Sequence, residues 1–447
     1  MMSETGVPPS TNVPLSTGVV PTASAPPAHE AAPEGRIVTV ARRRGMGIFL
    51  VLLAILTFWT FGLAVPTQVQ STFLLTGPPA VSVAPLVMSV HWISMVLGVL
   101  CGALGLVIVF RRRSRGTYLL FTLGVVFFIW SFLMWVSRGE SLNLVDMLAE
   151  TLIATTPLVY GSLSGVLCER SGVINIAIEG QFLAGAFLGA MIGSASGNLW
   201  LGMLGGAVAG GIFGSLLAFL ALRYGADQII VGVVIDAFCL GLTNFLTEEV
   251  LTPNQTTLNS PSTFSPIALP LISKIPVLGP VLFNENIFVY LAVILLFAIN
   301  IGLFRTRRGL RVRAVGEHPR AAETVGINVM RIRYQNVILG GVVAGIGGAV
   351  FTLGSVGQFS ADMTDGYGYI ALAAMIFGRW RPFGALVATL LFGFAISVQS
   401  FVAILRPGIP SPFLSMAPYI ITIAVVSGLV GRVRAPAADG QPYKSGG

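Results

Sequence analysis

The chain has 447 residues, of which 54% are hydrophobic and only 10% are charged, and its mean hydropathy is +0.85. Soluble domains carry about 25% charged residues, so this composition excludes an ordinary soluble enzyme and predicts an integral membrane protein. The formal net charge of +8 does not indicate nucleic-acid binding, because the basic residues lie in short clusters between apolar runs.

The first 41 residues are rich in Pro, Ser, Thr and Ala, and we expect them to form a disordered cytoplasmic tail (1–41). Three arginines, Arg42, Arg43 and Arg44, follow this tail directly. No cleavable signal peptide is expected, because the first apolar run begins only near Met46. Residues 42–143 are predicted to hold the N-terminal transmembrane helices.

Apolar runs long enough to cross a bilayer follow one another along the rest of the chain, and each needs about 20 residues to do so. The predicted spans are 46–66, 85–110, 117–136, 144–167, 173–195, 199–222, 228–248, 286–304, 334–357, 383–405 and 413–431. A shorter segment, 366–379, is either a re-entrant half-helix or part of a longer crossing. The sequence therefore predicts an all-α, polytopic transmembrane bundle of about 11–12 helices, some broken or re-entrant. Its main transmembrane domain covers 144–434, and 435–447 form a cytoplasmic tail.

The distribution of arginine predicts the orientation of the chain, because cytoplasmic loops are enriched in basic residues. Clusters at 42–44, 111–115 and 305–313, and Arg432 with Arg434, fall on one side if the short segment completes a crossing, which favours 12 crossings. The loop 252–285 carries one lysine and no arginine, as expected outside. We therefore expect a multi-pass protein of the plasma membrane with both termini in the cytoplasm.

One run, Glu169 to Gly180, interrupts apolar sequence with charged residues, an asparagine and glycines. A charge at membrane depth costs about 2.5–3.5 kcal/mol, so such residues usually face a cavity or a partner. Two interpretations stay open: a short cytoplasmic turn, or a broken helix that lines a substrate path. The residues assigned to this pathway are Asn175, Glu179, Asp236 and Asn244. Asn244 has a simpler use in interhelical hydrogen bonding.

The loop 305–333 is the long cytoplasmic loop between predicted spans. Pro319 suits a first helical position and Gly326 a position just after a helix, which predicts a short helix at about 319–325. This helix is either an interfacial connector or a docking helix for a soluble partner, since it is too short to persist alone. The residues assigned to docking are Glu317, His318, Pro319, Arg320, Ala321, Ala322 and Gly326.

Several residue types point away from catalysis. Lys274 and Lys444 are the only lysines and no G-x-x-x-x-G-K-[ST] motif occurs, so ATP is not hydrolysed through such a loop. No nucleophile–base pair or metal-ligand cluster lies in the spans, so neither an enzyme nor a bound metal or cofactor is expected. The glycines at 340, 341, 345, 347 and 348 are interpreted as close helix packing.

The run Glu169 to Gly180 resembles the E-R-S-G-V-x-N-I-x-x-E-G signature of ABC importer permeases of the simple-sugar and nucleoside type, in its nucleoside form. The run Gly316 to Ile327 is similar to the G-x-N-P-x-A-A-x-x-x-G-I cytoplasmic motif of that family, with His318 in place of Asn. The segment Ile275 to Phe283 resembles its external loop, and the similarity covers about 144–431.

This resemblance implies one permease subunit of a heteromeric importer. The implied partners are a second permease subunit, cytoplasmic ATP-binding subunits that hydrolyse ATP, and an extracytoplasmic substrate-binding lipoprotein, with nucleosides as substrates. The alternatives are a simple-sugar ABC permease, a channel, or an ion-coupled secondary transporter in which Glu179 and Asp236 serve as the coupling carboxylates.

Overall fold

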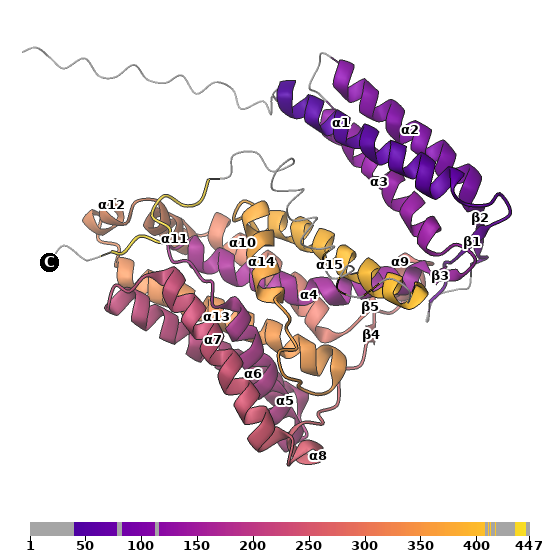
Figure 1. Ribbon diagram of the computed structural model, residues 1–447. Coiled ribbons are helices and arrows are strands. Elements are labelled where there is room, and N and C mark those ends of the chain that lie inside the picture. Colours follow the sequence, from indigo (N-terminus) through magenta and orange to yellow (C-terminus); the bar gives the residue numbers. More distant parts are fainter. Residues whose placement is uncertain are drawn as a thin grey trace, which may run out of the picture.

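The computed structural model describes residues 40–77, 83–111, 116–406 and 434–443, together with Pro410, Pro412 and Met416. Most of the predicted N-terminal tail and nearly all of the predicted span 413–431 lie outside the described residues. Within them, ten helices are long and apolar enough to cross a membrane, so the chain is an all-α, multi-pass bundle (Figure 1).

The membrane-length helices mostly follow the predicted apolar runs. They are α1 (Val40–Leu56) with its extension η1 (Thr57–Leu63), α2 (Val90–Phe110), α3 (Thr117–Val136), α4 (Leu144–Glu169), α5 (Ile178–Ser196), α6 (Leu199–Ala218) with η2 (Phe219–Arg223), α7 (Gln228–Leu246) with η3 (Thr247–Leu251), α10 (Ile287–Arg305), α13 (Val329–Phe351) with η5 (Thr352–Val356), and α15 (Pro382–Leu405). Four starts differ from the prediction by more than one residue: α1 begins six residues before 46, α2 five after 85, α5 five after 173, and α13 five before 334.

Helices α1, α2 and α3 form an N-terminal unit that stands at an angle to the other helices (Figure 1). At one end of the unit lies a small sheet of β1 (Gln70–Leu74), β2 (Leu86–Ser89) and β3 (Ser141–Asn143). β1 is central, antiparallel to β2 and parallel to β3, with Phe73 opposite Leu142. Phe73 and Leu142 belong to an apolar cluster, and side chains of α15 pack against it. This packing attaches the N-terminal unit to the main bundle.

The main bundle is held together by backbone contacts between glycines. A Cβ atom on Gly345 of α13 would lie 2.1 Å from the carbonyl oxygen of Gly206 in α6, and one on Gly348 would lie 2.1 Å from that of Phe182 in α5. Only glycine permits such an approach, because any side chain would overlap the neighbouring backbone. The predicted role of this glycine row in close packing is therefore confirmed.

The two ends of the main bundle differ in structure. One end, the loop end, carries residues 252–286 with α8 (Gln255–Leu258), β4 (Ile267–Ala268), η4 (Ile272–Lys274), α9 (Leu278–Leu282) and β5 (Asn284–Glu285). The other, the basic end, carries α11 (Arg307–Glu317), α12 (Pro319–Thr324) and residues 434–443 (Figure 1). The predicted short helix is confirmed: Pro319 opens α12, and Gly326 follows it with φ +81°. The preceding helix α11 was not predicted.

The short segment between α13 and α15 contains α14 (Tyr367–Phe377), whose 11 residues extend roughly 16 Å, about half the apolar thickness of a bilayer. On one side of it the amide of Phe359 donates to Oδ1 of Asn259 at the loop end, at 2.7 Å. On the other side, Nε of Arg170 donates to the carbonyl of Trp380 at the basic end, at 2.9 Å. The segment therefore runs from one end to the other as a loop followed by a half-helix.

Candidate functional site: two broken helices and a surface helix

The chain between α4 and α5 is not helical, although it is buried. Gly172 turns the backbone with φ +87° at the basic end, and Val173 and Ala177 are fully buried. The amide of Ile174 donates to Oε1 of Gln228 at 2.8 Å, so a side chain of α7 replaces a helical acceptor. Residues 170–172 form a turn, and residues 173–177 are a buried non-helical stretch that leads to the start of α5.

Glu179 lies in the first turn of α5 and is 5% exposed. Its carboxyl group accepts hydrogen bonds from Thr364 Oγ1 at 2.5 Å, from the amide of Gly366 at 2.9 Å and from that of Gly368 at 2.6 Å. These donors lie in or just before the first turn of α14. A Cβ on Gly368 would lie 2.5 Å from the amide nitrogen of Glu179, so the two helix starts touch through their backbones.

Asp236 joins α7 to both of these helix starts. Its carboxyl group accepts from the amide of Gly180 at 2.7 Å and from the hydroxyl of Tyr369 at 3.1 Å. It lies eight residues beyond Gln228, where α7 begins, which is about 12 Å along the helix. The cluster of carboxyl groups therefore lies in the interior of the bundle, away from both ends.

Asn175 belongs to the same region: its Nδ2 donates to Ser164 Oγ at 3.2 Å and to Gln181 Oε1 at 3.1 Å. The structure thus brings three of the four predicted pathway residues around the start of α5. Asn244 is not among them, because it lies about 12 Å further along α7 than Asp236. Its Oδ1 is buried without a hydrogen-bond partner among the described residues.

The electrostatic consequence of this arrangement follows from helix geometry. The N-terminus of a helix carries a partial positive charge, and here the N-termini of α5 and α14 meet inside the bundle. Glu179 places an acidic side chain between them. Half-helix ends that meet at membrane depth are a recurring way to build transport sites. Thr364, Gly366 and Gly368 were not predicted, because residues 357–368 carry no local sign of a contact with α5.

At the basic end, Glu169 and Arg170 contact two other elements: the end of α11 and the link between α14 and α15. A Cβ on Gly316 would lie 2.3 Å from the carbonyl oxygen of Arg170, so the end of α11 rests on the α4–α5 turn. The guanidinium of Arg170 donates to the carbonyls of Trp380 at 2.9 Å and Arg379 at 3.2 Å. Trp380 Nε1 in turn donates to the carboxyl group of Glu169. The turn is therefore bonded to the link between α14 and α15.

The predicted docking residues on and near α12 divide into two faces. Glu317, His318, Arg320, Ala321 and Gly326 are exposed and Pro319 is half-buried. Ala322, however, is only 4% exposed and packs against Val315 and Val329. The sequence assigns Ala322 to docking, but its side chain faces the chain itself, because α12 packs against α11 and α13. Val325, beyond the helix, is 75% exposed.

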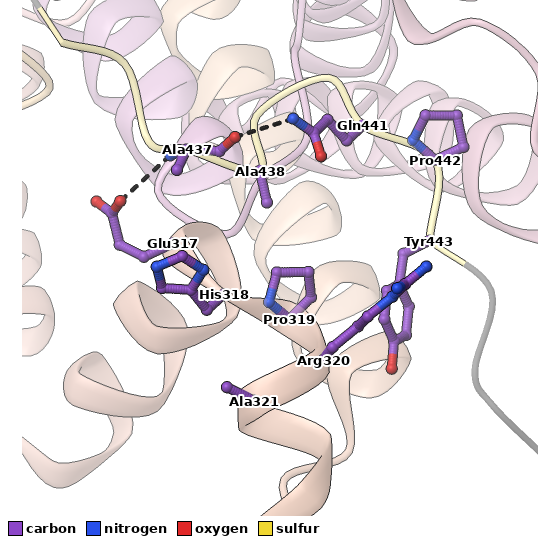
Figure 2. Close-up of a pocket in the computed structure, with 10 residues that line it drawn as sticks. All are labelled: Glu317, His318, Pro319, Arg320, Ala321, Ala437, Ala438, Gln441, Pro442 and Tyr443. Carbon is purple, nitrogen blue, oxygen red and sulfur yellow. Dashed lines mark hydrogen bonds between the residues drawn. The ribbon is translucent and has the colours of Figure 1, made fainter. Parts of the chain in front are cut away.

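A groove of about 510 Å³ runs between α12 and the segment 434–443 (Figure 2). Its lining residues come from both segments and are Glu317, His318, Pro319, Arg320, Ala321, Ala437, Ala438, Gln441, Pro442 and Tyr443. In this view, Glu317 reaches the backbone of Ala437, to which it is hydrogen bonded at 3.2 Å.

A multi-pass helical bundle with two broken helices meeting inside it, and a short surface helix at one end, has the architecture of a transport permease. A family model described as "Branched-chain amino acid transport system / permease component" matches residues 147–431, and the chain belongs to this family. No solved structure matches the chain.

Relatives with known names agree with this assignment. The guanosine ABC transporter permease protein NupQ of Bacillus subtilis is 41% identical over 66% of this chain and 95% of its own length. The nucleoside ABC transporter permease protein NupC of Lactococcus lactis is 39% identical over 68% and 99%. The putative glucose ABC transporter permease protein TsgC13 of Haloferax volcanii is 33% identical over 63% and 90%.

Proposed function

We propose that this chain is a membrane-spanning subunit of an ATP-driven importer of nucleosides, with ATP hydrolysed by a separate cytoplasmic subunit. The observation that carries the proposal is that the chain covers 95% and 99% of two relatives named for guanosine and nucleoside transport, at about 40% identity. The buried polar cluster supports it, because Glu179 already occupies the converging helix ends and an uncharged substrate needs no further countercharge.

In this proposal the substrate path runs beside the start of α5, where Asn175, Glu179 and Asp236 gather. Glu179 and Asp236 accept from backbone amides and hydroxyl groups at the starts of α5 and α14, so they fix the positions of α5, α7 and α14. Asn175 donates to side chains of α4 and α5. We refer to Asn175, Glu179 and Asp236 as the polar hub. Movement of the polar hub would open the path to one side of the membrane and then to the other. Asn244, whose buried Oδ1 has no partner in the part of the chain that the structure describes, is a second polar position along α7.

The ATP-binding subunit docks on the exposed face of α12 in this proposal, through Arg320, Ala321 and the neighbouring Val325. A displacement of α12 passes to α11, whose Gly316 rests on the carbonyl of Arg170. Arg170 is bonded to the link between α14 and α15, so both broken helices would respond together. This route joins the surface helix to the buried cluster through direct contacts.

The further partners are a second permease subunit, which makes a heterodimer, and an extracytoplasmic substrate-binding lipoprotein at the loop end. Both termini then lie in the cytoplasm with the basic end, as the arginine clusters predict. A cysteine placed after Arg434 should be protected from an impermeant thiol reagent in intact cells. Labelling of that cysteine from outside would reverse the orientation.

Uptake measurements test the substrate. Cells lacking this chain should lose uptake of labelled guanosine, adenosine and uridine, and the gene restored on a plasmid should return it. Glucose is the matched competitor, because the relative TsgC13 is named for glucose. Loss of glucose uptake with nucleoside uptake unchanged would replace the nucleoside assignment by a sugar. Uptake abolished by a protonophore while ATP is maintained would instead favour an ion-coupled transporter.

A further inference from the structure

The segment 434–443, at the C-terminal side of the last predicted span, is attached to four separate elements of the basic end. The amide of Ala438 donates to the carbonyl of Gly316 at 2.9 Å, and that of Ala437 donates to Glu317 Oε2 at 3.2 Å. Both acceptors belong to the end of α11, directly before α12. Figure 2 shows the bond to Glu317. The described residues of the expected tail are therefore packed on the bundle. We refer to 434–443 as the strap.

The strap reaches α12 itself through Tyr443. The hydroxyl of Tyr443 donates to the carboxyl group of Glu323, and its ring joins the cluster that buries Ala322. α12 has only six residues, and such a helix depends on the surfaces around it. The strap is thus one of the surfaces that hold α12 in place.

The side of the strap that faces the bundle is bonded to Arg333, a fully buried arginine in α13. Nη1 of Arg333 donates to the carbonyl of Gln441 at 3.1 Å and Nη2 to that of Ala438 at 3.5 Å, while its guanidinium lies 5.7 Å from the ring of Tyr443. A buried arginine is costly unless its donors are used. Backbone carbonyls of the strap supply acceptors for its two terminal nitrogens, while Nε has no partner among the described residues.

The strap also touches the run that leads to the broken helix. The carboxyl group of Asp439 lies beside that of Glu169, the last residue of α4. A Cβ on Gly440, where φ is +72°, would lie 2.7 Å from Cδ1 of Ile174. One on Gly172 would lie 3.1 Å from the carbonyl oxygen of Ala438. Residues 438–440 therefore lie directly on residues 169–174.

We propose that the strap is a positioning element, which ties α12 to the 169–174 run so that displacement of the surface helix reaches the start of α5. This inference rests on the proposed function, because it assumes that the ATP-binding subunit acts on α12. The strap supplies a second connection, parallel to the contact between Gly316 and Arg170. Its residues hold other elements in place and touch no substrate.

The test uses the complete transporter in liposomes with two variants of the strap. In one, Gly440→Val places a branched side chain against Ile174 at a positive φ. In the other, the chain ends after Ala435. The matched control is Gln441→Ala, which removes an exposed side chain bonded only within the strap, to the carbonyl of Ala437, and keeps the carbonyl that Arg333 binds. The measurements are nucleosides transported per ATP hydrolysed, and retention of the ATP-binding subunit on the purified complex.

Both strap variants should retain the ATP-binding subunit and hydrolyse ATP, yet transport at least fivefold fewer nucleosides per ATP, while Gln441→Ala behaves as wild type. An unchanged ratio in both strap variants would overturn the proposal. Loss of the ATP-binding subunit from the complex would also overturn it, since the strap would then be a docking surface.

A second measurement separates failure of this inference from failure of the proposed function. Hydrogen exchange on the purified chain needs neither substrate nor ATP. Gly440→Val should speed exchange at 173–178 and at 319–326 together, because the strap restrains both, while Gln441→Ala should leave both unchanged. Exchange that stays at the wild-type rate in either segment of Gly440→Val would contradict the strap, whatever the transporter carries.

Discussion

The N-terminal unit of α1–α3 and the main bundle around α4, α5 and α13 are built on different principles. In the apolar stretches of α4, α5 and α13, 89%, 72% and 67% of the residues are buried, against 39%, 28% and 33% for α1 with η1, α2 and α3. Ring contacts such as that between Phe61 and Trp135, with centroids 5.2 Å apart, join helices of the unit. The main bundle relies more on glycine backbones, which approach each other more closely there: a Cβ on Gly345 would lie 2.1 Å from the carbonyl of Gly206, whereas one on Gly47 of α1 would lie 2.8 Å from that of Gly105 in α2.

This difference shows where the fold can tolerate change. Side chains that pack in lipid can shift by a rotamer, whereas two backbones in contact have nothing that can move aside. The family match also begins only at residue 147, so it covers the main bundle and leaves out α1–α3. We expect the N-terminal unit to be adaptable and the main bundle to be rigid, and four predictions test this contrast.

The largest effect is expected for Gly345→Ala, because its Cβ would lie 2.1 Å from the backbone oxygen of Gly206. The cost should reach about 3 kcal/mol or more, as severe overpacking does. Gly124→Ala in α3 is the matched control: its Cβ would meet the methyl groups of Leu50 at 2.8 Å, and these can move. Its cost should stay below about 1 kcal/mol. Thermal unfolding of both purified variants measures the difference, and equal losses would remove the contrast.

The next effect is expected at the polar hub. Glu179→Gln keeps the volume but turns an amide NH₂ toward groups that donate, so at least one buried donor loses its acceptor, at about 1–3 kcal/mol. Nucleoside uptake should fall roughly tenfold or more, since 1.4 kcal/mol corresponds to a factor of ten. Glu249→Gln, at an exposed position, should transport normally. Full uptake by Glu179→Gln would show that the hub does not need the carboxylate.

A smaller effect separates the two faces of α12. Ala321→Glu, on the exposed face, should leave the melting temperature unchanged and reduce substrate-stimulated ATP hydrolysis roughly fivefold, as loss of a moderate interface contact does. Ala322→Glu, on the buried face, should instead lower the melting temperature, because it places a charge against Val315 and Val329. If both variants only destabilise the chain, α12 is a structural connector.

The smallest effect concerns pH. Burial is the main cause that raises the pKa of Asp439 from its ordinary 3.8 to about 7, while Glu169 and Cys168 of α4 and Arg333 of α13 face it. A carboxyl group with a raised pKa stabilises the folded form below its ordinary pKa, and this stabilisation is lost as the pH rises through about 7. Hydrogen exchange at 436–441, corrected for intrinsic rates, should therefore increase between pH 6 and pH 8. Asp439→Asn should remove most of that dependence.

The sequence predicted most features that depend on local pattern. Apolar runs located the helices, Pro319 and Gly326 bracketed α12, and the glycine row marked close packing. These signals survive in one sequence because they arise from length, periodicity and backbone preference within a few residues.

What the sequence did not reveal depends on residues far apart in the chain. α5 starts late because Gln228, 54 positions away, takes the amide of Ile174. The donors to Glu179 come from residues more than 180 positions further on. The strap and the burial of Ala322 were missed for the same reason, since no local pattern states which distant backbone a side chain will meet.

The position of Glu179 between two helix ends bears on how transport depends on the membrane potential. Moving one elementary charge through a membrane potential of 100 mV involves about 2.3 kcal/mol. The acidic side chain is fixed to the protein by three hydrogen bonds and balances the helix ends where they meet, so an uncharged solute passing them carries no current. The rate of nucleoside import should therefore be the same in polarised and depolarised vesicles, which makes the transporter usable by a cell whose membrane voltage has collapsed but whose ATP persists.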